Sequence, residues 1–131
     1  MRLRRTKLIL VFVTALFPPL AQAASSQNWL PDRGTIDEIE AAIAMPDGAR
    51  PIADYRRFYT GDRKDGRPVV RGTFVLQGLW DHLLQRPAAA PINIVEKADM
   101  PIILDGGCVV VNLEFDTQRK QIVSISCNGN A

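Results

Sequence analysis

The sequence predicts an α+β domain in which one N-terminal helix packs on a curved antiparallel sheet of about four strands. A C-terminal hairpin clipped by a disulfide completes the fold. Three observations support this class: an amphipathic helical segment, β-rich runs separated by polar turns, and one cysteine on each arm of the last pair of runs. A helix followed by several strands buries its apolar stripe against the sheet, and 131 residues suit one domain.

The first 23 residues have the pattern of a secretory signal peptide. Basic residues precede an apolar run from Leu8 to Leu16, and small residues lead up to Ala23. The apolar run is shorter than the roughly 20 residues that a membrane-spanning helix needs. We therefore expect cleavage after Ala23, no stable membrane anchor afterwards, and a secreted or periplasmic product.

Cleavage reverses the charge of the chain. The full sequence has a net charge of +2, with 16 basic and 14 acidic side chains. Four of the basic residues lie in residues 1–23, so the mature chain keeps 12 basic against 14 acidic side chains, a net of −2. This balance argues against a nucleic-acid partner, which would require a concentrated basic footprint.

A helix is expected after a flexible lead-in over residues 24–34, so that the single domain occupies residues 35–131. Thr35 and Glu38 have the spacing of a capping box at the start of this helix. Isoleucines three and four residues apart form one apolar face: Ile36, Ile39 and Ile43.

Two strands are expected over residues 54–60 and 69–76, joined by a charged turn over residues 61–68. Period-two alternation places three residues of the first strand on one face: Tyr55, Arg57 and Tyr59. In the second strand the inward face consists of Val70, Gly72, Phe74 and Leu76. Residues 77–84 suit a helical turn or a surface loop, and residues 92–96 a short strand.

The last quarter of the chain predicts a hairpin, with strands over residues 109–115 and 121–127. In one register Cys108 lies opposite Cys127, but apolar residues then pair with polar ones. A shift by one residue pairs apolar residues with apolar ones but moves Cys108 to the other face of the sheet. A bulge at Gly106-Gly107-Cys108 would reconcile the two. We expect a Cys108–Cys127 disulfide beside an irregularity, because export favours disulfides; two unpaired thiols are the alternative.

Few side chains suit catalysis or metal binding. His82 is the one histidine of the chain, whereas a hydrolytic triad needs a base, a nucleophile and an orienting group within reach. A zinc site needs several histidine or cysteine ligands. We therefore expect no enzyme activity, no metal and no cofactor, and a small hydrolase using His82 is the least favoured alternative.

Aromatic and charged side chains are the better functional candidates. Tyrosine, tryptophan and arginine are enriched at contact hot spots between proteins. We select five residues as a candidate ligand- or partner-binding set: Tyr55, Arg57, Tyr59, Trp80 and His82. The alternative is ordinary cross-strand packing of the same side chains.

The order of the expected elements resembles that of cystatin-like folds. The Gln-Val-Gly inhibitor loop of true cystatins has no counterpart here, so inhibition of cysteine proteases is not implied. We expect a small secreted or periplasmic binding protein that contacts a protein or another envelope macromolecule, an enzyme inhibitor being one form of this. The alternative is a small-ligand binder with a pocket between helix and sheet. The sequence leaves the oligomeric state open.

Overall fold

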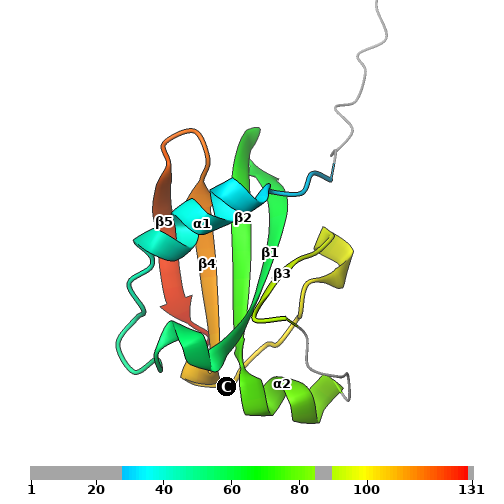
Figure 1. Ribbon diagram of the computed structural model, residues 1–131, viewed down its shortest axis with the longest axis vertical. Coiled ribbons are helices and arrows are strands. Elements are labelled where there is room, and N and C mark those ends of the chain that lie inside the picture. Colours follow the sequence, from blue (N-terminus) through cyan, green and yellow to red (C-terminus); the bar gives the residue numbers. More distant parts are fainter. Residues whose placement is uncertain (1–27, 85–89, 130–131) are drawn as a thin grey trace, which may run out of the picture.

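The computed structural model describes residues 28–84 and 90–129, so the predicted signal peptide lies outside the described residues. Helix α1 (Arg33–Ala42) crosses one face of a five-stranded sheet, while the short helix α2 (Gln77–Leu84) lies at one end of it (Figure 1). The expected α+β class is confirmed.

The sheet is mixed rather than antiparallel and has the strand order β3-β1-β2-β4-β5. Its strands are β1 (Tyr55–Lys64), β2 (Arg67–Leu76), β3 (Ile92–Ile94), β4 (Val110–Asp116) and β5 (Gln121–Cys127). Strand β3 pairs in parallel with β1, because β2 ends beside the start of β1 and β3 also begins there. Five strands replace the expected four, and the resemblance to a cystatin-like order is not confirmed.

Helix α1 begins earlier than the capping pattern predicts. Asp32 is the N-cap, and its carboxylate accepts a hydrogen bond of 2.7 Å from the backbone N–H of Thr35. The predicted cap at Thr35 is therefore wrong, because an aspartate three residues upstream is an equally good N-cap. The predicted apolar face is confirmed, since Ile36 and Ile39 have no exposed surface.

Part of the predicted lead-in lies against the domain. Trp29 is half-buried, and its indole Nε1–H donates a hydrogen bond of 3.2 Å to the backbone carbonyl of Asp62. A Cβ atom at Gly61 would overlap the Trp29 ring and backbone. Glycine at position 61 therefore makes room for the segment that enters α1.

The first hairpin is longer than expected. Strands β1 and β2 remain paired as far as Lys64 and Arg67, and a two-residue Asp65-Gly66 turn joins them. Both turn residues have positive φ, 50° and 75°, which is the conformation that tight hairpins require. The predicted turn over residues 61–68 is therefore wrong, because residues 61–64 and 67–68 are paired within the two strands.

The main core lies between α1 and the sheet. Tyr59 and Phe74 pack edge to face, with ring centroids 5.6 Å apart. A Cβ atom on Gly72 would lie 3.0 Å from the Phe74 ring and 3.2 Å from the Tyr59 ring, so any larger residue would force these rings to shift. The buried members of this core are Ile36, Ile39, Tyr55, Tyr59, Val70, Phe74, Val111, Leu113 and Phe115.

The C-terminal hairpin has a register different from both expected ones. Val111 pairs with Cys127 and Leu113 with Ile125, and the register shifts between Glu114 and Phe115. The ladder irregularity is thus six residues beyond Cys108 rather than at it. The predicted bulge site is wrong, because Cys108 lies before β4 and the strand register does not have to place it opposite Cys127.

The predicted Cys108–Cys127 disulfide is confirmed. Cys108 lies in a short 3-10 turn (Gly107–Val109), which Gly106 and Gly107 enter with φ values of 109° and 56°. Closing a loop with a sequence separation of 19 contributes about 3 kcal/mol in the chain-entropy model. The bond is compatible with an oxidising extracellular or periplasmic environment.

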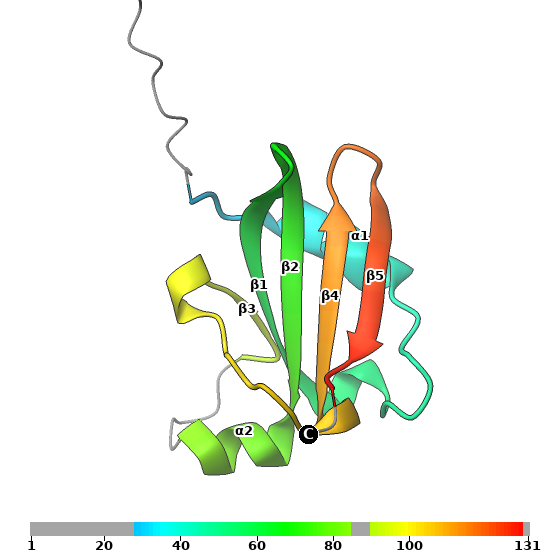
Figure 2. The same ribbon diagram turned by 180° about the vertical axis from the view of Figure 1, so that it is seen from behind.

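In the described part of the chain, no α-helix crosses the second face of the sheet. We call this surface, formed by the β1, β2, β4 and β5 side chains that point away from α1, the helix-free face. Residues 95–104 cross one part of it (Figure 2), where Met100, Val95 and Ile103 pack on Phe58 and Val75. The rest of this face is not covered by any described element.

Candidate functional site

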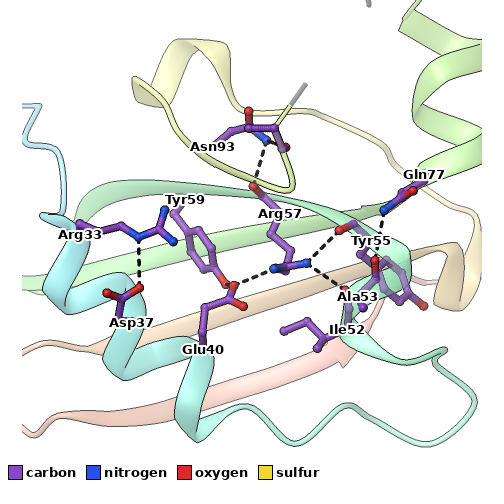
Figure 3. Close-up of polar contacts among 11 residues, drawn as sticks. Arg33, Asp37, Glu40, Ile52, Ala53, Tyr55, Arg57, Tyr59, Gln77 and Asn93 are labelled. Atoms are coloured by element: carbon purple, nitrogen blue, oxygen red, sulfur yellow. Dashed lines mark hydrogen bonds and ion pairs between the residues drawn. The ribbon is translucent and has the colours of Figure 1, made fainter. Parts of the chain in front are cut away.

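Three of the predicted site residues lie in the interior of the protein. Tyr55, Arg57 and Tyr59 share one face of β1, as expected, but this face is turned toward α1 (Figure 3). The tyrosines have no exposed surface and Arg57 is 8% exposed. They form a polar layer inside the main core rather than a surface patch.

Glu40 of α1 is the partner that organises this layer (Figure 3). Arg57 Nε donates to Glu40 Oε1 at 2.8 Å, and the Tyr59 hydroxyl donates to the same oxygen at 2.5 Å. The Arg57 Nη1 group also donates to the carbonyls of Ile52 and Tyr55, both at 3.1 Å. The layer is therefore a closed hydrogen-bonded network that ties α1 to β1.

Burial and the hydrogen bond to Glu40 both raise the pKa of Tyr59, so the phenol remains a neutral donor. Tyr55 makes a second link: its hydroxyl donates to the Cys108 carbonyl at 2.6 Å and accepts from the Arg50 N–H at 3.1 Å. These contacts join β1 to the disulfide turn. These contacts stabilise the fold, and they engage the hydroxyl groups of both tyrosines.

The remaining predicted residues, Trp80 and His82, belong to α2 at the end of the sheet. His82 is exposed, and the side chain of Trp80 lies outside the described part of the chain. Gln77 at the start of α2 donates to the Ala53 carbonyl at 3.1 Å, which holds the helix near the start of β1. The five predicted residues thus fall into a buried group and a group on α2.

The helix-free face carries a charged network that the sequence analysis did not select. Asp62 accepts hydrogen bonds from Arg71 Nε at 2.6 Å and from Lys97 Nζ at 2.8 Å. Lys64 Nζ donates to Glu114 at 2.8 Å, and Arg71 Nη1 lies 3.8 Å from the other Glu114 oxygen. The charged residues at positions 62, 64, 71 and 114 alternate with their neighbours and so indicated a charged face of the sheet. No sequence pattern shows which face of a sheet a helix covers.

The acids and the cations of this network differ in exposure. The Asp62 and Glu114 side chains are 13% and 10% exposed, whereas those of Arg71, Lys64 and Lys97 are 46%, 52% and 56% exposed. The carboxylates therefore lie close to the sheet, and the more exposed cations lie above them at the surface. Partial burial opposes ionisation of Asp62, but hydrogen bonds from Lys97, Arg71 and the Arg63 backbone lower its pKa below the ordinary value.

Two hollows open on the helix-free face. The larger is a groove of about 350 Å³. It is lined by Thr60, Arg71, Gly72, Thr73, Lys97, Met100, Ile102, Asn112 and Leu113. The smaller measures about 80 Å³. It is lined by Lys64, Arg67, Val69, Glu114, Asp116, Arg119 and Val123.

Within residues 28–84 and 90–129, no three His, Cys, Asp or Glu side chains gather closely enough to hold a metal ion. None of the helices in the described part is both long and apolar enough to cross a membrane. No family model, curated protein or solved structure matches this chain.

Proposed function

We propose that the mature chain is a small, exported, non-catalytic binding protein that contacts another macromolecule through its helix-free face. The observation that supports this proposal most strongly is the layering of charge on that face, with half-exposed cations above nearly buried carboxylates. A partner that approaches this face meets Lys64, Arg71 and Lys97 first. The chemistry therefore favours an acidic partner surface.

The smaller hollow extends this cationic layer to the end of the sheet. Arg119 is 62% exposed above Asp116, which is 6% exposed, and Arg67 lines the same hollow. The mature chain is acidic as a whole, so a local excess of exposed cations is unexpected. Such a local field steers the approach of a partner and selects its charge.

Exposed aliphatic side chains accompany the cations. Ile102 and Leu104 are 85% and 88% exposed in the segment that crosses the face, and Val123 is 51% exposed at the smaller hollow. Large aliphatic residues beside polar groups are typical of contact surfaces. An inhibitor of an enzyme is one form that such a binding protein could take.

Capture from an envelope extract by the exported, oxidised protein tests this proposal. The double substitution Arg67→Glu and Arg119→Glu reverses two charges at the smaller hollow. We expect affinity for the captured partner to fall by at least about tenfold, because like charges would then face each other across the contact. His82→Ala should leave capture unchanged, whereas a hydrolase would lose its activity.

The matched control is the double substitution Arg33→Glu and Lys120→Glu. These side chains are 62% and 69% exposed and pair with Asp37 and Glu38 of α1, away from the helix-free face. The control protein should capture the partner as the unmodified protein does. Equal loss in both double variants, or loss in neither, would contradict the proposal.

A further inference from the structure

The groove on the helix-free face contains a buried hydroxyl without a hydrogen-bond partner. Thr60 is 2% exposed and lines the groove, and its Oγ1 makes no hydrogen bond to any described residue. A buried hydroxyl that stays unpaired destabilises the fold, so native proteins rarely retain one without a reason. An oxygen atom of a bound ligand would supply the missing acceptor.

Two cations line the same groove. Arg71 and Lys97 both bind the carboxylate of Asp62, while Glu114 binds Lys64 and lies 3.8 Å from Arg71 Nη1. In this network three positive charges thus share two negative charges. The guanidinium of Arg71 has five N–H donors, of which Asp62 engages Nε–H and Glu114 lies near Nη1, so donors remain for the carboxylate of a ligand.

Part of the groove lining is apolar. Met100 and Ile102 line it, and Ile102 remains 85% exposed. Methionine is flexible and adapts its shape to an apolar guest. Small-molecule sites typically combine such apolar walls with a few polar groups and measure some hundreds of cubic ångströms, as does this groove of about 350 Å³.

We infer that this groove binds a small amphiphilic carboxylate, a carboxylate joined to a short aliphatic chain. Arg71 and Lys97 hold the carboxylate, the Thr60 hydroxyl donates to one of its oxygens, and Met100 and Ile102 cover the chain. The inference goes beyond the proposed macromolecular contact, with which it shares Arg71, Lys97 and Ile102. It also moves the ligand site to the face opposite the expected space between α1 and the sheet, which core side chains fill.

Titration of the oxidised protein with octanoate, followed by amide NMR, tests the inference. We expect saturable shifts at Thr60, Arg71 and Asn112. Octylammonium, with the same chain and the opposite charge, should produce none of them. Arg71→Gln should weaken octanoate binding by about tenfold, because it removes a charge-assisted hydrogen bond. Thr60→Val, which keeps the shape and removes the hydroxyl, should weaken it by about fivefold.

Lys120→Gln is the matched control, because Lys120 pairs with Glu38 of α1 and lies away from the groove. It should bind octanoate unchanged. If Thr60→Val does not fold, the half-exposed Arg71 position still decides the matter. Absence of saturable shifts, or equal binding of octylammonium, would overturn the inference. The Arg67→Glu, Arg119→Glu protein separates the two proposals, since it should lose the macromolecule and keep octanoate.

Discussion

The two faces of the sheet carry similar polar groups, but the donors of these groups differ in exposure. On the face toward α1, the Glu40 carboxylate accepts from Arg57 and Tyr59, and Arg57 is 8% exposed. On the helix-free face, the Asp62 carboxylate accepts from Arg71 and Lys97, whose side chains are about half exposed. In both places one largely buried carboxylate accepts from two donors, and on the helix-free face Glu114 adds a second carboxylate that binds Lys64.

The difference shows that the covering layer, rather than residue type, separates a stabilising network in the core from a charged network at the surface. A buried charge that loses its partner is costly, because no water replaces the lost contact. A half-exposed charge can exchange its partner for water or for a ligand at little cost. Arg57 therefore serves folding, while Arg71 is free to change partners.

Neighbouring residues of β2 should show the largest contrast between the faces. Phe74 is fully buried under α1, whereas Thr73 lies on the helix-free face, where its hydroxyl makes one long hydrogen bond of 3.5 Å to Asn112. Phe74→Ala should lower the free energy of unfolding by about 4 kcal/mol through lost packing and cavity formation. Thr73→Ala should lower it by less than about 1 kcal/mol.

Urea unfolding followed by circular dichroism measures both values. Both variants should retain the disulfide, which mass spectrometry verifies. Similar losses for the two would mean that the helix-free face is packed as tightly as the covered one, and the comparison would fail.

Glu40→Gln tests the buried network and should lower the free energy of unfolding by less than Phe74→Ala does. The amide keeps the shape of the side chain but leaves the Arg57 charge without its counter-ion. We expect a loss of about 2 kcal/mol, below the cost of a fully buried pair, because the Glu40 side chain is 18% exposed. The measurement is the urea midpoint at neutral pH.

The matched control for Glu40 is Asp37→Asn on the same helix. Asp37 is 63% exposed and pairs with Arg33 one turn away, so its loss should change the free energy of unfolding by less than about 0.5 kcal/mol. An equal effect at positions 37 and 40 would show that the Glu40–Arg57 contact contributes no more than a surface pair.

The sequence allowed correct prediction of the α+β class, the isoleucine face of α1 and the disulfide, because each depends on local spacing or on the only two cysteines. It predicted a short strand over residues 92–96, where β3 lies, but not the parallel pairing of β3 with β1. The reason is that parallel pairing depends on where the chain re-enters the sheet after β2, and no local sequence pattern indicates that place. The register of the C-terminal hairpin also differed from the predicted ones. The Gly106-Gly107 turn places Cys108 outside β4, so the disulfide does not fix which residues of β4 and β5 pair.

The candidate site was harder to predict than the fold. Alternation correctly grouped Tyr55, Arg57 and Tyr59 on one face, but alternation alone does not show which face a helix covers. The decisive partner, Glu40, lies 17 residues before Arg57 and carries no local signal of the contact. The groove depends on Lys97, Met100 and Ile102 lining the same hollow as residues of β1, β2 and β4, a tertiary arrangement without a sequence motif.

The smallest expected effect concerns the pH dependence of the Asp62 network. The pKa of Asp62 is lowered in the folded protein below its ordinary value of 3.8. Its contribution to stability is therefore complete above that value and is lost as the pH falls through the lower folded pKa. Asp62→Asn should be less stable than the unmodified protein by under about 1 kcal/mol at neutral pH, because both cations are half exposed. Urea midpoints measured at decreasing pH should show this gap closing below pH 3.8. A gap that stays constant into strong acid would mean that the Asp62 charge does not hold Arg71 and Lys97 in place, and the groove would then lack a prearranged cationic end.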